Sequence, residues 1–449
     1  MRDDYLIRQN PMHALIVFAM PMILGNLFQQ TYTMVDSAMV GRFVSEQALA
    51  AVGASYSLTN TFICVAVGGG IGASVTVSRY FGAGEIRQMK TVIYTALLTF
   101  LGISLGLGAL GMTLGRQIMQ MLNTPADVLD MATAYLRIYF VGLPFLFMYN
   151  ILSAMFNALG KSKIPLGFLI FSSLFNIILD WYFVTRLNMG VTGVAWATLI
   201  AQGISALLSF GVLRNVLRQM VSPAAKSFDV RELAPMAKIA LPSILQQSTV
   251  SIGMMLVQSV VNGFGSETLA GFSAANRVES LCIVPMTCIG SALSSFTAQN
   301  MGAGSTRRVE EGYHAAIKLV IGFAVVIAVV LSRFADSIIM AFLGETGSSA
   351  AMETGISCLR FTSCFFCLIG FKTSTDGVLR GAGDMTMFTV ANLANLSVRV
   401  VIAMTCAPRM GVFMVWVAVP IGWFTNWAIS YLEYRTGKWK NKLPEKAAA

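Results

Sequence analysis

Long apolar stretches alternate with short polar, glycine- or proline-containing breaks along almost the whole chain. A helix that crosses the hydrocarbon core of a bilayer needs about 20 predominantly apolar residues, and the stretches are about that long or longer. They predict twelve membrane-spanning helices, near residues 13–39, 48–80, 88–114, 127–158, 164–186, 190–214, 234–262, 268–301, 311–333, 351–381, 386–406 and 411–435. The longest connection, near residues 215–233, divides the chain almost in half.

The composition excludes a soluble enzyme of this length. Of the 449 residues, 56% are hydrophobic and 12% are charged, whereas soluble domains carry about 25% charged residues. Twelve spans leave almost no chain for a folded domain outside the membrane. The polar start, MRDDYLIRQNPMH, precedes an apolar stretch that is too long for a signal peptide, so we interpret that stretch as the first span.

The basic residues predict an orientation in the cell (plasma) membrane. Outside the predicted spans, 20 Lys and Arg residues lie on the side of the two termini and 5 lie on the opposite side. Short cytoplasmic loops carry an excess of Lys and Arg, so both termini are expected in the cytoplasm. The net charge of +10 is then a signal of topology and not of nucleic-acid binding.

The two halves of the chain resemble each other at an offset of 220–223 residues. Pro21 corresponds to Pro242, YFGAG at 80–84 to NMGAG at 300–304, and FNALGKSK at 156–163 to LRGAGDMT at 379–386. Parallel repeats of this kind are typical of transporters with the substrate path between the halves. The sequence therefore predicts an all-α polytopic membrane protein of two six-helix lobes, residues 1–216 and 233–449, joined by a cytoplasmic linker, residues 217–232.

The first predicted helix carries a polar stripe that ends in an acid. Steps of three, four and three residues place four polar side chains on one helical face, namely Asn26, Gln29, Thr33 and Asp36. Pro21 lies upstream and can bend the helix. An acid within a span indicates a functional group; alternatively, Asp36 lies near the outer end, hydrated and paired with Arg42.

A second acid lies in the fifth predicted span. Asn176 and Asp180 are four residues apart and share one face, and Thr198 of the next span can add a hydroxyl oxygen. Two carboxylates, an amide oxygen and a hydroxyl suit Na⁺, whereas two adjacent carboxylates can also share a proton. A purely structural hydrogen-bonded pair is the other interpretation of Asn176 and Asp180.

The second half lacks this acidic set. Val257 and Ala418 stand where the repeat would place the counterparts of Asp36 and Thr198. Other charged residues lie within its spans as secondary candidates for substrate contact or gating, chiefly Glu279, Lys372, Asp376 and Arg399. Lys372 and Asp376 are four residues apart and can also simply pair.

No residue set predicts catalysis, a resident metal or a cofactor. Gly68–Ala73 has the spacing of a dinucleotide fingerprint but lies inside an apolar stretch, so we expect close helix packing or local flexibility there. Cys364 and Cys367 form a C-x-x-C with nothing beside it to complete a zinc site. We therefore expect a transporter and not an enzyme, with no cofactor beyond a coupling cation.

These residues resemble the multidrug and toxic compound extrusion (MATE) family over nearly the whole chain. The similarity rests on MVDSAMVGRF at 34–43 after the proline-containing first helix, YFGAG and its repeat, FNALGKSK, FNIILD, GVAWAT and VLRGAGD. The resemblance implies an efflux antiporter in which two six-helix lobes alternate access and inward Na⁺ or H⁺ movement drives out organic, often cationic, compounds.

The resemblance also implies where the coupling cation binds. The family's first-lobe site falls on Asp36, Asn176, Asp180 and Thr198. The acidic second-lobe positions of some members are glutamines in helix 7 and Gly370 here, which favours coupling through the first lobe. The alternative on the same fold is a flippase or exporter of a lipid-linked or anionic metabolite. A monomer is expected, because the path lies within one chain.

Overall fold

The chain is almost entirely helical. The computed structural model describes residues 4–122, 124–344 and 348–442, and no strand occurs in these segments. The helices are α1 (Tyr5–Arg8), α2 (Pro11–Phe43), α3 (Glu46–Gly82), α4 (Ile86–Met121), α5 (Ala126–Ala158), α6 (Lys163–Thr185), α7 (Gly190–Gln219), η1 (Val230–Glu232), α8 (Leu233–Asn262), α9 (Ser266–Gly302), α10 (Thr306–Leu343), α11 (Ser349–Ser363), α12 (Phe366–Ala382), α13 (Met385–Met410), α14 (Phe413–Thr436) and η2 (Lys438–Lys442).

The spans agree with the prediction except at one break. Eleven of the described helices are long and apolar enough to cross a membrane, and α11 with α12 makes a twelfth span that is bent by 52°. The sequence predicted one span there. At the bend, the hydroxyl groups of Thr362 and Ser363 donate to backbone oxygens of their own helix. Such side chains compete with the helical hydrogen bonds, and the Phe365 N–H bonds only three residues back, to Thr362.

The structure divides into two compact units whose boundaries lie inside helices. The first unit is Leu24–Ile244, and the second is Met1–Ile23 together with Leu245–Ala449. The boundaries fall in α2 and α8, each two residues after a proline, Pro21 or Pro242. They differ from the predicted lobe boundaries at 216 and 233, because each of these two helices packs its early part in one unit and its later part in the other.

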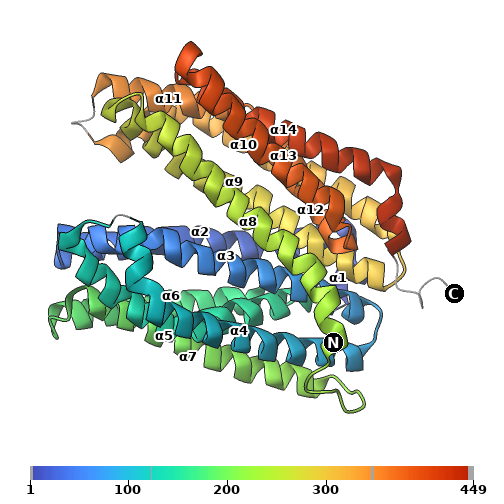
Figure 1. The fold of residues 1–449 in the computed structure, drawn as a ribbon. Coiled ribbons are helices and arrows are strands. Elements are labelled where there is room, and N and C mark those ends of the chain that lie inside the picture. The colour runs from blue at the N-terminus through green and yellow to red at the C-terminus, as the bar shows by residue number, and fades with distance from the viewer. Residues whose placement is uncertain (1–3, 123, 345–347, 443–449) are drawn as a thin grey trace. The chain divides into compact units, whose positions relative to one another are not determined.

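The first unit is a bundle of α3, α4, α5, α6 and α7, which pack as neighbours along their lengths (Figure 1). The glycine-rich segment of α3 is helical and tightly packed, which is the first of the two alternatives that the sequence left open. A Cβ atom at Gly72 would lie 2.6 Å from Cβ of Ala240 in α8, and one at Gly69 would meet the Phe100 ring at 2.2 Å. Glycine is required there because the neighbouring helices occupy the space of a side chain.

The second unit is centred on α9, which packs against α10, α11 and α12. A Cβ atom at Gly377 of α12 would lie 2.4 Å from the backbone oxygen of Gly290 in α9, so these two helices approach at backbone distance. The short helix α1 belongs to this unit: Leu6 is fully buried, and the Asn300 side chain donates to its backbone oxygen over 3.1 Å.

The repeat in the sequence corresponds to a repeat in the backbone. YFGAG ends α3 and NMGAG ends α9, with Gly84 at φ +72° and Gly304 at φ +75°. In both turns a backbone N–H after the glycine donates to an oxygen five residues earlier, from Glu85 to Tyr80 and from Ser305 to Asn300, each over 2.9 Å. A positive φ favours glycine, which explains why both turns carry it.

Candidate cation site

Three helices of the first unit bring the predicted residues together. Asp36 lies on α2, Asn176 and Asp180 lie on α6, and Thr198 lies on α7. Because α6 and α7 pack against each other after a short connection, the inward face of α6 meets Thr198. Asn176 is 2% exposed and Asp180 is 1% exposed, so both are deeply buried.

Asn176 is the centre of the hydrogen bonds. We place its amide nitrogen toward Asp180, because both ends of the amide then have complementary partners. The nitrogen donates to Asp180 Oδ2 over 3.0 Å and to the Tyr32 hydroxyl oxygen, and the amide oxygen accepts from the Thr198 N–H over 3.1 Å. Asn176 thereby joins α2, α6 and α7.

The two carboxyl groups are in contact with each other. Asp36 and Asp180 are close enough to share a hydrogen bond. Asp36 Oδ1 and Asp180 Oδ1 are buried, and neither has a hydrogen-bond partner among the residues that the structure describes. Buried polar atoms normally have partners, and two like charges at this distance repel each other in a medium of low polarity. A proton or a metal cation between the carboxyl groups would remove the repulsion.

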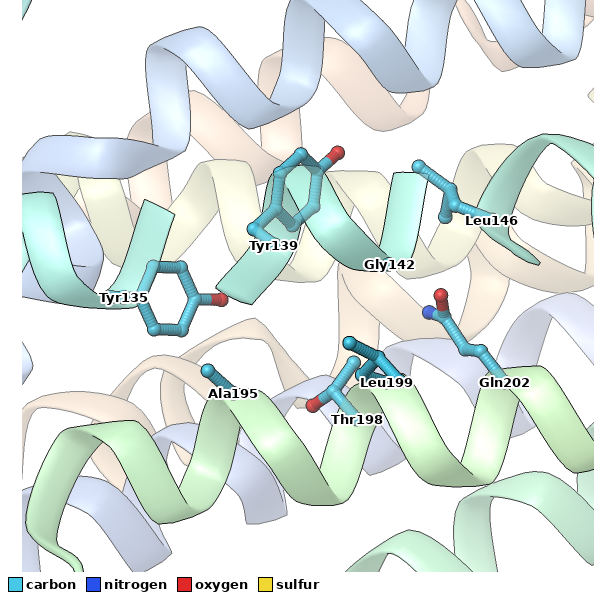
Figure 2. Close-up of a pocket in the computed structure, with 8 residues that line it drawn as sticks. All are labelled: Tyr135, Tyr139, Gly142, Leu146, Ala195, Thr198, Leu199 and Gln202. Atoms are coloured by element: carbon cyan, nitrogen blue, oxygen red, sulfur yellow. The ribbon is translucent and has the colours of Figure 1, made fainter. Parts of the chain in front are cut away.

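A small cavity adjoins these groups between α5 and α7. Its volume is about 20 Å³, and its lining includes Tyr135 and Tyr139 of α5 and Thr198 and Gln202 of α7 (Figure 2). A water molecule needs about 10–15 Å³ on this measure. The cavity can therefore hold a water molecule or a small ion beside Thr198.

Two tyrosines extend the predicted set. Tyr32 shares hydrogen bonds with Asn176 and Thr198, and Tyr135 lies near both carboxyl groups. Tyr32 is four residues before Asp36, and this helical spacing places them on one face, so the sequence contained a signal for it. Tyr135 carried no comparable signal, because its proximity depends on how α5 packs.

The rest of the polar stripe is more exposed than Asp36. Asn26, Gln29 and Thr33 are exposed, and the Thr33 hydroxyl donates to the backbone oxygen of Gln29 over 2.9 Å. Pro21 is buried inside α2, in the second unit. The side chain of Arg42, the alternative partner of Asp36, lies outside the described residues.

The secondary candidates form a separate buried network in the second unit. Lys372 Nζ lies 3.7 Å from Asp376 Oδ2, which also accepts from Asn392 over 3.3 Å, while Ser430 donates to Asp376 Oδ1 over 2.7 Å. Lys372 and Asp376 thus pair within α12, as their spacing suggested. Both oxygens of Asp376 have partners, unlike the carboxyl groups of the first unit.

The other two secondary candidates come from different helices. Glu279 on α9 and Arg399 on α13 are near enough to attract each other. Their charges are opposite, so this pair needs no additional cation. Among the acidic candidates, Asp36 and Asp180 are therefore the pair that faces another acid and not a basic group.

Comparison with known proteins identifies the family. The MatE family profile matches residues 21–182 and 242–405, one match in each half of the chain. The chain belongs to the MATE family. It is 30% identical over 433 residues to the probable multidrug resistance protein YpnP of Bacillus subtilis, and the match covers 96% of each protein. As a MATE protein it is a multi-span transporter of the plasma membrane, in a family of multidrug efflux proteins.

Two further similarities are more distant. The FAD transporter of Shewanella oneidensis is 24% identical over 351 residues, which cover 76% of this chain and 77% of that protein. A crystal structure of a MATE protein in the bent conformation superposes with a TM-score of 0.90 at 23% identity and covers 100% of both chains. The structural similarity confirms the MATE fold with its repeated, all-helical lobes.

Proposed function

We propose that this MATE protein is a cation-coupled efflux antiporter that exports organic, cationic compounds by alternating access. Na⁺ or H⁺ is the coupling ion and binds at Asp36 and Asp180, with Asn176, Thr198 and Tyr32 around it. The observation that carries the proposal is the buried contact of two carboxyl groups, each of which leaves one oxygen without a partner. Carboxylate and hydroxyl oxygens suit a hard cation.

The division of α2 supports a route from the cation to the rest of the protein. Asp36 lies in the part of α2 that belongs to the first unit, whereas residues 11–23 of the same helix belong to the second. A cation would strengthen the attraction of Asp36 to α6 and so change the position of α2. Pro21 has no backbone N–H, so a change of direction near it breaks one hydrogen bond fewer.

Coupling also requires that cation and substrate favour different states of the transporter. A ligand shifts a conformational equilibrium only by its difference in affinity for the two states, and the effect of one ligand on the other is reciprocal. We propose that the cation enters from outside and favours release of the substrate outward. The Lys and Arg distribution supports cytoplasmic termini, and we propose a monomer as the functional unit.

The test is ethidium export from proteoliposomes under one gradient at a time. Wild type, Asp36→Asn and Asp180→Asn are compared under an Na⁺ gradient at equal pH and then under a pH gradient without Na⁺. Asp127→Asn is the matched control, because Asp127 is exposed in the first turn of α5 in the same unit. We expect one gradient to drive export by wild type and Asp127→Asn, and neither gradient to drive export by the other two variants. Gradient-driven export by Asp36→Asn at the wild-type rate would refute the coupling site.

An anionic cargo is the second candidate function. The buried network of the second unit contains three cations, Lys372, Arg380 and Arg399, against the two carboxyl groups of Asp376 and Glu279. An excess of buried positive charge suits an anionic group, and the similarity to a FAD transporter is consistent with it. If neither gradient moves ethidium, the same vesicles loaded with FAD would test this alternative.

A further inference from the structure

A second, larger pocket of the first unit lies between α4 and α5 and shares no residue with the cation site. Its volume is about 180 Å³. Polar side chains from both helices line it together with Phe140, whose ring packs where Gly111 and Gly115 have no side chain. The polar lining residues on which the inference rests are Thr113, Arg116 and Gln117 of α4 and Thr133 and Arg137 of α5.

The pocket carries an uncompensated positive charge. Arg116 Nη1 lies 2.8 Å from Asp130 Oδ1, so this arginine has an acidic partner. Arg137 is exposed, and it makes no ion pair or hydrogen bond with any residue that the structure describes. The hydroxyl groups of Thr113 and Thr133 donate to backbone oxygens of their own helices. The donors available to a ligand are therefore mainly those of the two guanidinium groups.

The position of the two arginines along their helices places them at a membrane interface. Residues 138–160 contain no charged side chain between Arg137 and Lys161, and residues 91–115 contain none between Lys90 and Arg116. At 1.5 Å per residue these stretches are about 34 and 37 Å long, close to the hydrocarbon thickness of about 30 Å. Lys90 and Lys161 mark one interface, so Arg116 and Arg137 mark the other.

The side chains around the pocket are apolar and lie on the outer surface of the helix bundle. Leu110, Met112 and Leu114 of α4 are each about half exposed, as expected of side chains that contact lipid. A guanidinium group that opens toward lipid at the level of the headgroups has phosphate oxygens within reach, and its planar fork matches them with two parallel hydrogen bonds. The apolar border and the polar interior together distinguish this pocket from an ordinary surface depression.

We propose that the pocket between α4 and α5 binds a phosphate group through Arg137 and Arg116. The phosphate belongs to the headgroup of a lipid in the leaflet at this end of the helices, which the proposed orientation makes the outer leaflet. A soluble phosphate compound presents the same chemistry, and the experiment separates the two sources.

The test measures lipid binding by the purified full-length protein in a phosphate-free detergent solution. Dihexanoyl-phosphatidylglycerol is titrated, and its half-saturation point is read from the rise in melting temperature. A hydrogen bond to a charged group contributes substantially to binding. Arg137→Gln should therefore raise the lipid concentration at half-saturation by about tenfold or more. Arg137→Lys keeps the positive charge but not the two parallel N–H donors of the guanidinium group, so it should lose less affinity for the lipid than Arg137→Gln. Arg186→Gln is the control, since Arg186 lies over the Trp181 ring at the end of α6, outside the pocket.

The remaining measurements distinguish a lipid phosphate from a soluble phosphate and show whether the pocket binds either. Binding that inorganic phosphate does not displace identifies the lipid headgroup, and displacement by inorganic phosphate identifies a soluble phosphate compound. Arg116→Gln is measured as well, so that a poorly folded Arg137→Gln does not end the test. The proposal is overturned if both pocket variants bind like wild type, or if Arg186→Gln weakens binding as much as they do.

Discussion

Replacing Asn176 by leucine tests whether the first-unit cluster is a coupling site and not only a structural contact. Leucine has a similar volume but no hydrogen-bonding group. The change removes the bond to Asp180 Oδ2 (3.0 Å), the bond to the Tyr32 hydroxyl and the bond from the Thr198 N–H (3.1 Å). Asp36 and Asp180 are both retained, but Asp180 loses the hydrogen bond that holds its carboxyl group.

The expected magnitudes differ for stability and for coupling. Interhelical hydrogen bonds in membrane proteins contribute about 0.6 kcal/mol each on average, so the two neutral bonds, to Tyr32 and from Thr198, together contribute about 1 kcal/mol to the free energy of unfolding. The bond to the Asp180 carboxylate is charge-assisted and contributes about 1.5–3 kcal/mol. Without that donor the ionised carboxylate is less stable relative to its cation-bound form, so the cation concentration for half-maximal export should fall by about 10- to 100-fold.

The assay combines two measurements on the same variant. Export of ethidium is recorded against the concentration of the coupling cation, and unfolding is followed by thiol labelling of the buried Cys64, Cys288 and Cys358. Asn392→Leu is the matched control. Asn392 is 5% exposed and donates to the Asp376 carboxylate over 3.3 Å, which is the corresponding amide–carboxylate contact of the second unit.

The two variants should lose similar stability, and only Asn176→Leu should shift the cation dependence. An unchanged cation dependence in Asn176→Leu, or an equal shift in Asn392→Leu, would contradict the assignment of coupling to the first unit.

Two further predictions concern packing and the connection between α7 and α8. Gly72→Val should destabilise the protein by about 1–3 kcal/mol, because its Cβ would lie 2.6 Å from Ala240, whereas Gly106→Ala has free space and should cost nothing; thermal unfolding compares them. The pKa of Asp229 is lowered, mainly by the hydrogen bond from the Lys226 side chain and next by the hydrogen bond from the Arg231 backbone N–H. A carboxyl group whose pKa is lowered in the folded state stabilises the fold at pH values above its ordinary pKa. The melting temperatures of wild type and Asp229→Asn should therefore differ at neutral pH and converge as the pH falls below about 4. A constant difference across that range would contradict this.

The sequence was sufficient for the features that depend on one helix at a time. Apolar length predicted the spans, and the recurrence of Pro21 as Pro242 and of YFGAG as NMGAG predicted the repeat that the backbone shows. The helical period placed Asn176 and Asp180 on one face. Each of these properties follows from local spacing, and local spacing is present in the sequence itself.

Other features depend on which faces of different helices meet, and only the tertiary structure decided them. The polar linker near residues 217–232 suggested that the chain divides there. The compact units divide instead inside α2 and α8. Packing, and not composition, determines in which unit each half of these helices is buried. Tyr135 lies near acids of other helices, and Arg116 and Arg137 of two different helices line one pocket. Helical periodicity gives the direction of a side chain on its own helix, and the partner that it meets is set by how the helices pack.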